Sequence, residues 1–363
     1  MDRFAFIIHP LEKEELYRKF SWAEKVPETV VDNFVRFIPP VKASHITGIK
    51  SKTGKEIEGF FIGVPLTSRQ ILTLPVNKVL KKIIKACKLA EELGAKIVGL
   101  GAFTSVVADK GISIAREVDI PVTTGNSYTV ATAIEGTKVA AEKMGHKLDS
   151  STLAVVGATG SIGRTVSLML SKEIKAIILV ARNIDRLKLL KEEIQGQNPE
   201  VEVSYTTDVN RAVKEAQIIV SASGAVEALI DPYSLQPGAV VCDVARPRDV
   251  AASVSRERDD VLVIEGGIVE VPGEVEFNLK FGYPPGTAYA CMAETMLLTL
   301  EERFSEDYSL GPIIEIEKVK ETLEMAAKHG FRLAGLRNSE TPLSEEEISA
   351  IRERARAGSL VCF

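Results

Sequence analysis

Short apolar runs alternate with amphipathic segments along the second half of the chain, a pattern typical of parallel α/β proteins. The pattern predicts strands over Thr152–Val156, Ala176–Val180, Val201–Tyr205, Ile218–Val220, Val240–Asp243 and Val261–Ile264. Helices are expected from the turn after Gly157 to about Leu170 and over Ile184–Ile194. Because strand–helix–strand units cross over with a fixed hand, this half predicts a doubly wound parallel sheet.

The first half of the chain is a less regular mixture of strands and helices. The polar run Ser51–Lys55 lies between two apolar runs and predicts a hairpin turn. Strands are expected at Phe4–Ile8, Ala43–Ile49, Ile57–Val64, Lys96–Leu100 and Pro121–Thr123, and helices over Val76–Leu93 and from about Asn126 to Gly145. Beyond Pro285 the pattern becomes helical, with segments expected at Gly286–Arg303, Ile316–His329 and Ser344–Ala357.

Composition excludes several classes of protein. With 45% hydrophobic and 26% charged residues, the chain of 363 residues is neither disordered nor fibrous. A net charge of -5 gives no basic field for nucleic acid. No apolar stretch approaches the ~18 residues of a membrane helix, and the first ten residues lack a signal-peptide pattern. Four scattered histidines and four cysteines predict neither a metal site nor a disulfide framework, so a cytoplasmic location is expected.

A glycine-rich turn follows the first strand of the second half. It reads G-x-x-G-x-x-G and leads directly into a helix, which is the context a dinucleotide-binding turn needs. Glycines allow the backbone to approach a pyrophosphate that rests on the helix N-terminus. The candidate cofactor residues of this turn are Gly157, Thr159, Gly160, Ser161, Ile162 and Gly163. The alternative is a tight strand–helix turn without a ligand.

The end of the second strand bears on the choice of cofactor. An NAD enzyme usually carries a carboxylate here, whereas this chain has Arg182 and Asn183, with Arg186 one turn later. Guanidinium groups suit the 2′-phosphate of NADP(H), so NADPH is the expected cofactor. Small residues at later strand ends are expected near the nicotinamide ribose: Ser221, Ala222, Ser223, Gly266 and Gly267.

Cys291 is the candidate nucleophile. The prolines and glycine before it predict that a helix begins nearby, and a helix start favours the thiolate form. The alternative is a small core residue among alanines. Cys87, Cys242 and Cys362 fit structural roles better. No histidine lies near Cys291 in the sequence, so a general base must come from the fold or from water.

Several segments together resemble the cyanobacterial acyl-(acyl-carrier-protein) reductases, which form fatty aldehydes. The matching segments run in the family's order and are Gly101–Ser105, Thr123–Asn126, Gly157–Gly163, Ala181–Asn183, Gly266–Glu270, Ala290–Glu294 and Lys328–Phe331. The resemblance implies that Cys291 accepts the acyl group from a thioester and that NADPH reduces the resulting acyl-enzyme to an aldehyde. The oxyanions formed on the way need hydrogen-bond donors, for which the candidates are Thr104, Ser105, Thr124 and Asn126. Their alternative role is ordinary turn and cap chemistry.

The helix expected over Val76–Leu93 carries lysines at spacings of three and four residues. They are Lys78, Lys81, Lys82, Lys85 and Lys88, and this spacing predicts one basic face. Because acyl carrier proteins are acidic, the face is a candidate docking site, with a solvated helix as the alternative. The expected partners are acyl carrier protein or coenzyme A thioesters and an enzyme that consumes the aldehyde.

These inferences give an expected organisation and leave three functions open. Residues 1–147 are expected to form an α/β substrate and carrier-docking domain, 148–285 a Rossmann NADP-binding domain, and 286–363 C-terminal helices that carry the nucleophile and pack back on the cleft. The first function is the thioester reductase. The second is a dehydrogenase like those for shikimate or methylene-tetrahydrofolate, with direct hydride transfer. The third is an NADP-binding sensor without enzymatic activity.

Overall fold

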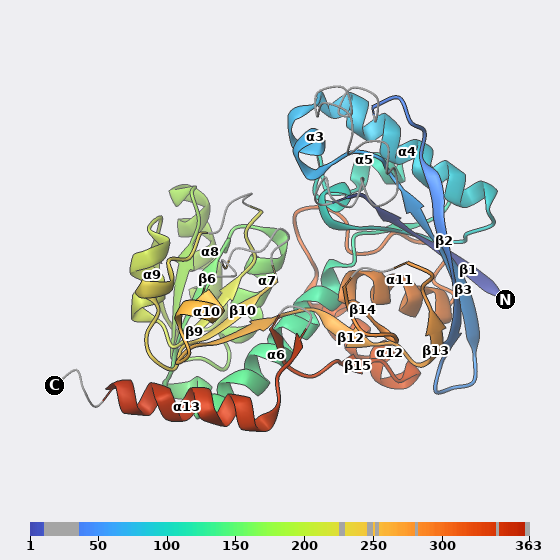
Figure 1. Cartoon of the computed structure of the whole chain (residues 1–363). Helices are drawn as coiled ribbons and strands as arrows, with labels where there is room; N and C mark the ends of the chain where they lie inside the picture. The colour runs from blue at the N-terminus through green and yellow to red at the C-terminus, as the bar shows by residue number, and fades with distance from the viewer. Residues whose placement is uncertain are drawn as a thin grey trace, which may run out of the picture. The chain divides into compact units, whose positions relative to one another are not determined.

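The chain folds into two compact units (Figure 1). A computed structural model describes residues 1–10, 36–224, 229–244, 250, 254–279, 282–338 and 341–359. The first unit consists of Met1–Tyr128, Glu270–Ile313 and Lys320–Arg332. The second consists of Thr129–Val269, Ile314–Val319 and Leu333–Phe363.

This division differs from the three expected ranges. The chain passes into the second unit at Thr129, inside helix α6 (Asn126–Met144), rather than after residue 147. Most of residues 286–332 belong to the first unit, because helix α11 (Ala290–Leu300) packs on the strands of its sheet. The segment from Leu333 onward joins the second unit instead of forming a part with the helices before it.

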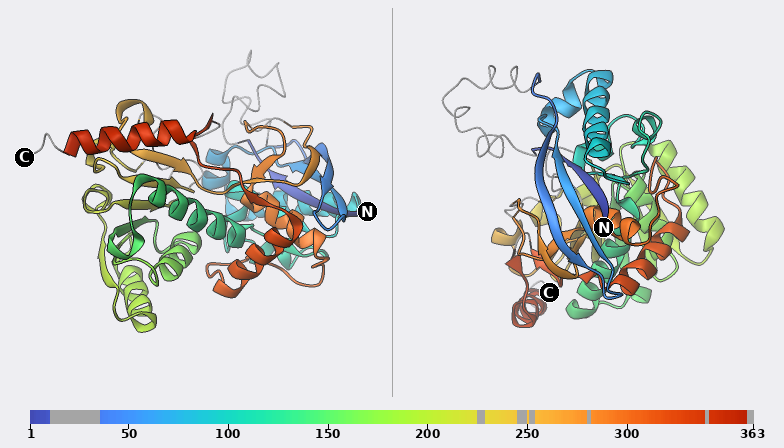
Figure 2. Two further views of the ribbon diagram at one scale, coloured as in Figure 1. Left: turned by 90° about the horizontal axis from the view of Figure 1, so that it is seen from below. Right: turned by 90° about the vertical axis from the view of Figure 1, so that its right-hand side faces the viewer.

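The first unit contains a mixed six-stranded sheet in the order β13-β2-β3-β1-β4-β5. Its strands are β1 (Asp2–Ile8), β2 (Val41–Lys50), β3 (Glu56–Gly63), β4 (Val98–Leu100), β5 (Val122–Thr123) and β13 (Gly273–Glu276). Strands β3, β1, β4 and β5 run parallel, so their carboxyl ends lie at one edge. The long strands β2 and β3 form the expected hairpin and run side by side (Figure 2).

The first unit also contains several helices. They are α3 (Ser68–Thr73), α4 (Val76–Glu92), α5 (Ile112–Ala115), α11 and α12 (Ile316–His329), together with the short 3₁₀ turn η2 (Ala102–Ser105). Val79, Ile83 and Cys87 of α4 are fully buried in one core with Ile7 of β1. Burial of a large aliphatic side chain contributes about 1.5–3 kcal/mol, which holds α4 on the parallel strands.

The second unit contains a six-stranded parallel sheet in the order β11-β10-β9-β6-β7-β8. Its strands are β6 (Thr152–Val156), β7 (Ala176–Val180), β8 (Glu202–Thr206), β9 (Ile218–Ser221), β10 (Val240–Asp243) and β11 (Leu262–Glu265). Read from the first strand along the chain, this is the order 3-2-1-4-5-6 reversed, which defines a Rossmann-type nucleotide-binding sheet. The expected fold class is therefore confirmed.

The remaining helices and strands are short or lie mostly in the second unit. The helices are α7 (Ser161–Leu170), α8 (Ile184–Gln197), α9 (Val209–Glu215), α10 (Val254–Glu257) and α13 (Glu345–Ser359), with 3₁₀ turns η3 (Leu148–Ser150) and η4 (Pro232–Ser234). Two small sheets pair β14 (Thr287–Tyr289), β12 (Ile268–Glu270) and β15 (Arg332–Leu333), and β16 (Arg337–Asn338) with β17 (Thr341–Pro342). Helix α13 lies beside α6, where Arg352 donates to the Lys143 carbonyl at 3.1 Å (Figure 1).

The helix around Cys291 begins later than the sequence pattern predicts. Residues Thr287–Tyr289 form strand β14, and helix α11 starts only at Ala290. Gly286 has φ +76°, a left-handed conformation that ends rather than starts a helix. Cys291 is therefore the second residue of the helix, nearer its N-terminus than expected.

Candidate functional site

The glycine-rich turn of the second unit is closed by backbone contacts that leave no room for side chains. Gly157 has φ +81°, and a Cβ there would lie 2.7 Å from the Ala222 carbonyl oxygen. A Cβ on Gly163 would lie 2.4 Å from the Gly157 oxygen, so the start of α7 sits directly on the turn. Glycine is thus required at both positions by the packing of backbone on backbone.

The start of α7 offers backbone donors to an anion. Gly160 is its N-cap residue and, as a glycine, provides no side-chain cap. Ser161 is buried, while Thr159 and Ile162 are half-buried beside it. A helix N-terminus and its dipole suit a pyrophosphate, and the turn's glycines form a cradle that a Cβ would fill. The residues present therefore fit a dinucleotide.

The end of β9 lies against the same turn. A Cβ on Gly157 would meet the Ala222 carbonyl carbon and the Ser223 nitrogen, each at 2.8 Å. Strands β6 and β9 are neighbours at the point where the strand order reverses, the usual place for a bound dinucleotide. The structure thus brings Ser221, Ala222 and Ser223 to the glycine turn, as their place in the sequence suggests.

Arg182 and its neighbours follow β7, the strand beside β6. Arg182 and Arg186 are exposed, and their guanidinium groups have no partner among the described residues. Asn183 caps α8, accepting a hydrogen bond from the Arg186 N–H at 3.0 Å. These two unpaired guanidinium groups follow the strand next to β6, which carries the glycine-rich turn. They are available to the 2′-phosphate that distinguishes NADP(H) from NAD(H).

Gly266 and Gly267 are required by packing and turn geometry. A Cβ on Gly266 would lie 2.4 Å from a Val244 methyl carbon and 2.8 Å from the Cys242 sulfur. Gly267 has φ +88° and turns the chain between β11 and β12. Both observations explain these glycines without a cofactor contact.

Cys291 lies in the first turn of α11, half-buried, against the loop that follows β5. Gly125 of this loop has φ +72°, and a Cβ there would lie 2.2 Å from the Cys291 Cα and 2.3 Å from its Cβ. The N-cap residue Tyr289 gives α11 no side-chain cap. The cysteine thus occupies an uncapped helix N-terminus in contact with a loop at the carboxyl edge of the parallel strands, where the dipole favours a thiolate.

The other cysteines have structural surroundings. Cys87 is fully buried in α4, and burial raises the pKa of its thiol. Cys242 is fully buried in β10, with its sulfur 3.8 Å from the Ala133 carbonyl oxygen. Cys362 lies outside the described residues.

Glu294 was not predicted as a site residue, although it stands in the segment that carries Cys291. It is fully buried, and its oxygens accept hydrogen bonds from the Thr123 hydroxyl (2.5 Å) and the Tyr128 N–H (2.8 Å). The Thr123 oxygen accepts in turn from the Gly125 N–H at 3.1 Å. The signal available in the sequence was a single charged residue within a segment that has no other charged side chain.

The four candidate oxyanion donors differ in how their side chains are used. The hydroxyls of Thr104 and Ser105 each donate to a backbone carbonyl in their own 3₁₀ turn, at 2.6 Å. The Thr124 hydroxyl donates to the Ser309 carbonyl. Since a hydroxyl has one proton, none of these three has a donor left. Asn126 begins α6, is 8% exposed, and has no partner among the described residues, so it remains the candidate.

His9 lies at the carboxyl end of β1 but is neutral. Its Nε2 accepts from the Phe103 N–H at 3.1 Å, so Nδ1 carries the proton and donates to the Pro10 carbonyl at 3.0 Å. Burial lowers the pKa of His9 to about 4, against the opposing effect of the Pro10 bond. The residue anchors η2 and is not a free base near neutral pH.

The basic face of α4 contains four of the five expected lysines. The exposed ones, which form no ion pair with the described residues, are Lys78, Lys81, Lys85 and Lys88. Lys82 is half-buried and donates to the Arg36 carbonyl at 2.9 Å. Burial, followed by the charge of Lys85, lowers the pKa of Lys82 to about 8. Lys82 therefore does not belong to the open face.

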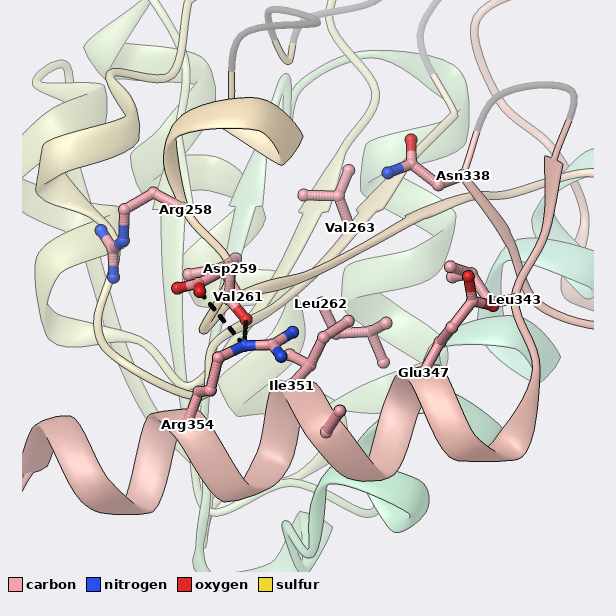
Figure 3. Close-up of a pocket in the computed structure, with 11 residues that line it drawn as sticks. Arg258, Asp259, Val261, Leu262, Val263, Asn338, Leu343, Glu347, Ile351 and Arg354 are labelled. Atoms are coloured by element: carbon pink, nitrogen blue, oxygen red, sulfur yellow. Dashed lines mark hydrogen bonds and ion pairs between the residues drawn. The ribbon is translucent and has the colours of Figure 1, made fainter.

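A pocket of about 310 Å³ lies in the second unit between α13 and the edge strand β11 (Figure 3). Its floor is apolar and includes Val261, Leu262 and Ile351. Among its charged residues, Arg258 pairs with Asp260, and Arg354 Nε donates to the Asp259 carbonyl at 2.7 Å. None of the residues predicted from the sequence lines this pocket.

Neither a metal-binding cluster nor a membrane-spanning helix is found among the described residues. Within the described ranges no three His, Cys, Asp or Glu side chains gather in a group able to hold a metal ion. No helix described has the length and hydrophobicity needed to span a bilayer.

The Rossmann-type sheet and its glycine cradle define the class of protein, one with an NAD(P)-type dinucleotide-binding fold. Residues 138–265 match the family model of shikimate/quinate 5-dehydrogenase. Aminotransferase PigE of Serratia sp. is 32% identical over 293 residues, which are 78% of this chain but 33% of that protein, so the chain spans about a third of its length. Quinate dehydrogenase from Corynebacterium glutamicum in complex with NAD has a TM-score of 0.38 at 10% identity, covering 89% of this chain and 98% of that chain.

A further relative identifies the family. Long-chain acyl-[acyl-carrier-protein] reductase of Synechococcus elongatus is 30% identical over 310 residues, covering 81% of this chain and 87% of that protein. The chain belongs to the family of this reductase, the family that its ordered motifs resemble.

Replacement of Gly125 tests the contact with Cys291. We expect Gly125→Ala to lower the free energy of unfolding by about 2–5 kcal/mol, because a strained φ is joined by a collision with backbone. Alkylation of Cys291 by iodoacetamide, followed by mass spectrometry of the peptide, should change in rate. Gly54→Ala is the matched control, since Gly54 also has positive φ but meets nothing within 4 Å. The contact is refuted if both variants lose the same stability and keep the wild-type alkylation rate.

Proposed function

We propose that this chain is an NADPH-dependent reductase that converts a fatty acyl thioester of acyl carrier protein or coenzyme A into a fatty aldehyde. The observation that carries the proposal is Cys291 in the uncapped first turn of α11, against the loop at the carboxyl end of β5. The dinucleotide cradle at Gly157 and membership of the reductase family support it.

The first step is acyl transfer to Cys291. Its thiolate attacks the thioester carbonyl, the bond to the carrier sulfur breaks, and the carrier thiolate leaves and takes up a proton. The dipole of α11 stabilises the attacking thiolate. His9 is neutral, and both of its ring nitrogens are engaged in hydrogen bonds, so it is not free to act as a base. We therefore assign water as the acceptor of the thiol proton.

The second step is reduction of the acyl-enzyme. NADPH, when bound, supplies the hydride for the thioester carbonyl. The resulting oxyanion collapses, the carbon–sulfur bond breaks, and Cys291 recovers its proton as the aldehyde leaves. Asn126 is the side-chain donor we assign to the oxyanion, because its amide is uncommitted and follows the glycine that touches Cys291.

Cys291→Ala tests the covalent mechanism. We expect loss of nearly all aldehyde formation with NADPH binding retained, because the variant lacks the acyl acceptor. Intact-mass spectrometry after mixing wild-type protein with palmitoyl thioester, without NADPH, should show one added acyl group mapped to Cys291. Cys87→Ala and Cys242→Ala are matched controls, and apart from packing losses they should keep activity.

The same experiment separates the alternatives. Wild-type turnover in Cys291→Ala would favour the dehydrogenase with direct hydride transfer. Absence of NADPH consumption with palmitoyl and stearoyl thioesters would favour the sensor.

Arg182→Ala tests the choice of cofactor. We expect wild-type protein to prefer NADPH over NADH and the variant to lose much of this preference through weaker NADPH binding. A charge-assisted bond to phosphate contributes about 1.5–3 kcal/mol, or roughly tenfold to a hundredfold in Kd. Fluorescence titration with both cofactors measures the ratio. Arg211→Ala, an exposed arginine of α9 paired with Glu215, is the control. If the ratio of the Kd values for NADPH and NADH is unchanged in Arg182→Ala, Arg182 does not select the cofactor.

Reversal of the exposed lysines tests docking of the carrier. We expect Lys78→Glu, Lys81→Glu and Lys85→Glu together to raise KM for acyl carrier protein and to leave KM for acyl-coenzyme A nearly unchanged. The difference should shrink with added salt, since the Debye length is ~8 Å at physiological ionic strength. Reversal of Lys172, Lys175 and Lys214 in the second unit is the matched control. Equal losses on both substrates would count against docking at α4.

A further inference from the structure

A buried carboxylate lies one helical turn after Cys291. Glu294 is fully buried in α11, and among the side chains buried with it in that helix are Met296 and Leu297. A buried carboxylate is costly unless its oxygens are hydrogen-bonded, so its partners indicate its role.

The partners of Glu294 come from the segment that carries Gly125. Oε1 accepts from the Thr123 hydroxyl at 2.5 Å, and Oε2 accepts from the Tyr128 N–H at 2.8 Å. Burial raises the pKa of Glu294, and four hydrogen bonds act in the opposite direction. Their donors are the Thr123 and Ser309 hydroxyls and the Tyr128 and Ser127 N–H groups. The pKa of Glu294 is raised on balance, and in the bonds from Thr123 and Tyr128 its oxygens are the acceptors.

These bonds link Glu294 to Cys291 through the loop. The Thr123 hydroxyl that donates to Glu294 also accepts from the Gly125 N–H at 3.1 Å. Gly125 lies on the Cys291 backbone with no space for a Cβ. Ser309 also contacts this segment, because its hydroxyl forms a hydrogen bond of 2.6 Å with the Ser127 hydroxyl. The carboxylate therefore fixes the separation between the loop and the first turn of α11.

We infer that Glu294 is a positioning residue for Cys291: it ties the Thr123–Tyr128 segment to α11 and so holds Gly125 and Asn126 at the cysteine. This inference rests on the proposed function, in which Cys291 accepts the acyl group. A displacement of about 1 Å in such a site can cost up to a hundredfold in rate, so a residue that acts only through a neighbouring loop has a large effect.

Glu294→Gln is the main test. It keeps the side-chain shape but replaces an acceptor oxygen with an NH₂ donor, which then faces either the Thr123 hydroxyl or the Tyr128 N–H. We expect acylation of Cys291, measured by intact mass in a single turnover without NADPH, to slow by about tenfold or more. The pH profile of Cys291 alkylation should shift, while the Kd for NADPH stays within about twofold because the cradle lies in the other unit.

Two further variants keep the inference testable. Thr123→Val removes the bridging hydroxyl with little change of shape and should reproduce the effect. Thr299→Val is the matched control, because Thr299 is a fully buried polar residue of the same helix whose hydroxyl donates to Thr295 at 2.7 Å. It should leave acylation and alkylation unchanged.

The outcomes separate this inference from the proposed function. A folded Glu294→Gln protein with wild-type acylation rate and alkylation profile overturns the positioning role. If that variant does not fold, a wild-type profile in Thr123→Val overturns it. If wild-type Cys291 is alkylated but accepts no acyl group, the proposed function fails, and the alkylation profiles still decide whether Glu294 positions the cysteine.

Discussion

The contact of Gly125 with the backbone of Cys291 is the constraint on which the candidate active site depends. It brings the loop after β5 to the first turn of α11, and the two segments are 166 residues apart in the chain. The contact tolerates no side chain and needs a left-handed residue, so only glycine meets both conditions without strain. Because Asn126 follows directly, the same contact places an uncommitted amide next to the residue that touches the cysteine.

Both units use glycines to bring a loop into direct contact with the backbone of another segment. In the second unit Gly157 and Gly163 let the turn, the end of β9 and the start of α7 meet backbone on backbone. In both units a helix that lacks a side-chain cap begins at such a contact. An uncapped helix start provides N–H donors and a positive dipole end, which suit a pyrophosphate in one unit and a thiolate or oxyanion in the other.

Most of the buried polar side chains discussed for the first unit are already engaged in structural hydrogen bonds, so few remain to act on a substrate. The hydroxyls of Thr104, Ser105 and Thr124 have their protons in bonds to carbonyls, and both ring nitrogens of His9 are occupied. These groups stabilise the turns at the carboxyl edge of the sheet instead of facing a reacting carbonyl. Among the described candidates of this unit, Cys291, the start of α11 and the Asn126 amide stay available to the proposed reaction. This small set fits the proposed reaction, in which the thiolate is the nucleophile and the cofactor is the hydride donor.

The sequence by itself determined the Rossmann-type sheet, the glycine cradle, the arginines after β7 and the candidate cysteine. Each of these depends on local periodicity or on a motif whose parts are adjacent in the chain. Only the tertiary structure decided that the segment after Pro285 rejoins the first unit, that Lys82 leaves the basic face, and that Glu294 ties the loop to α11. The reason is physical. A sequence pattern reports which positions are apolar and which turns need glycine, but whether a hydroxyl or a carboxylate finds a partner depends on groups brought together from distant segments.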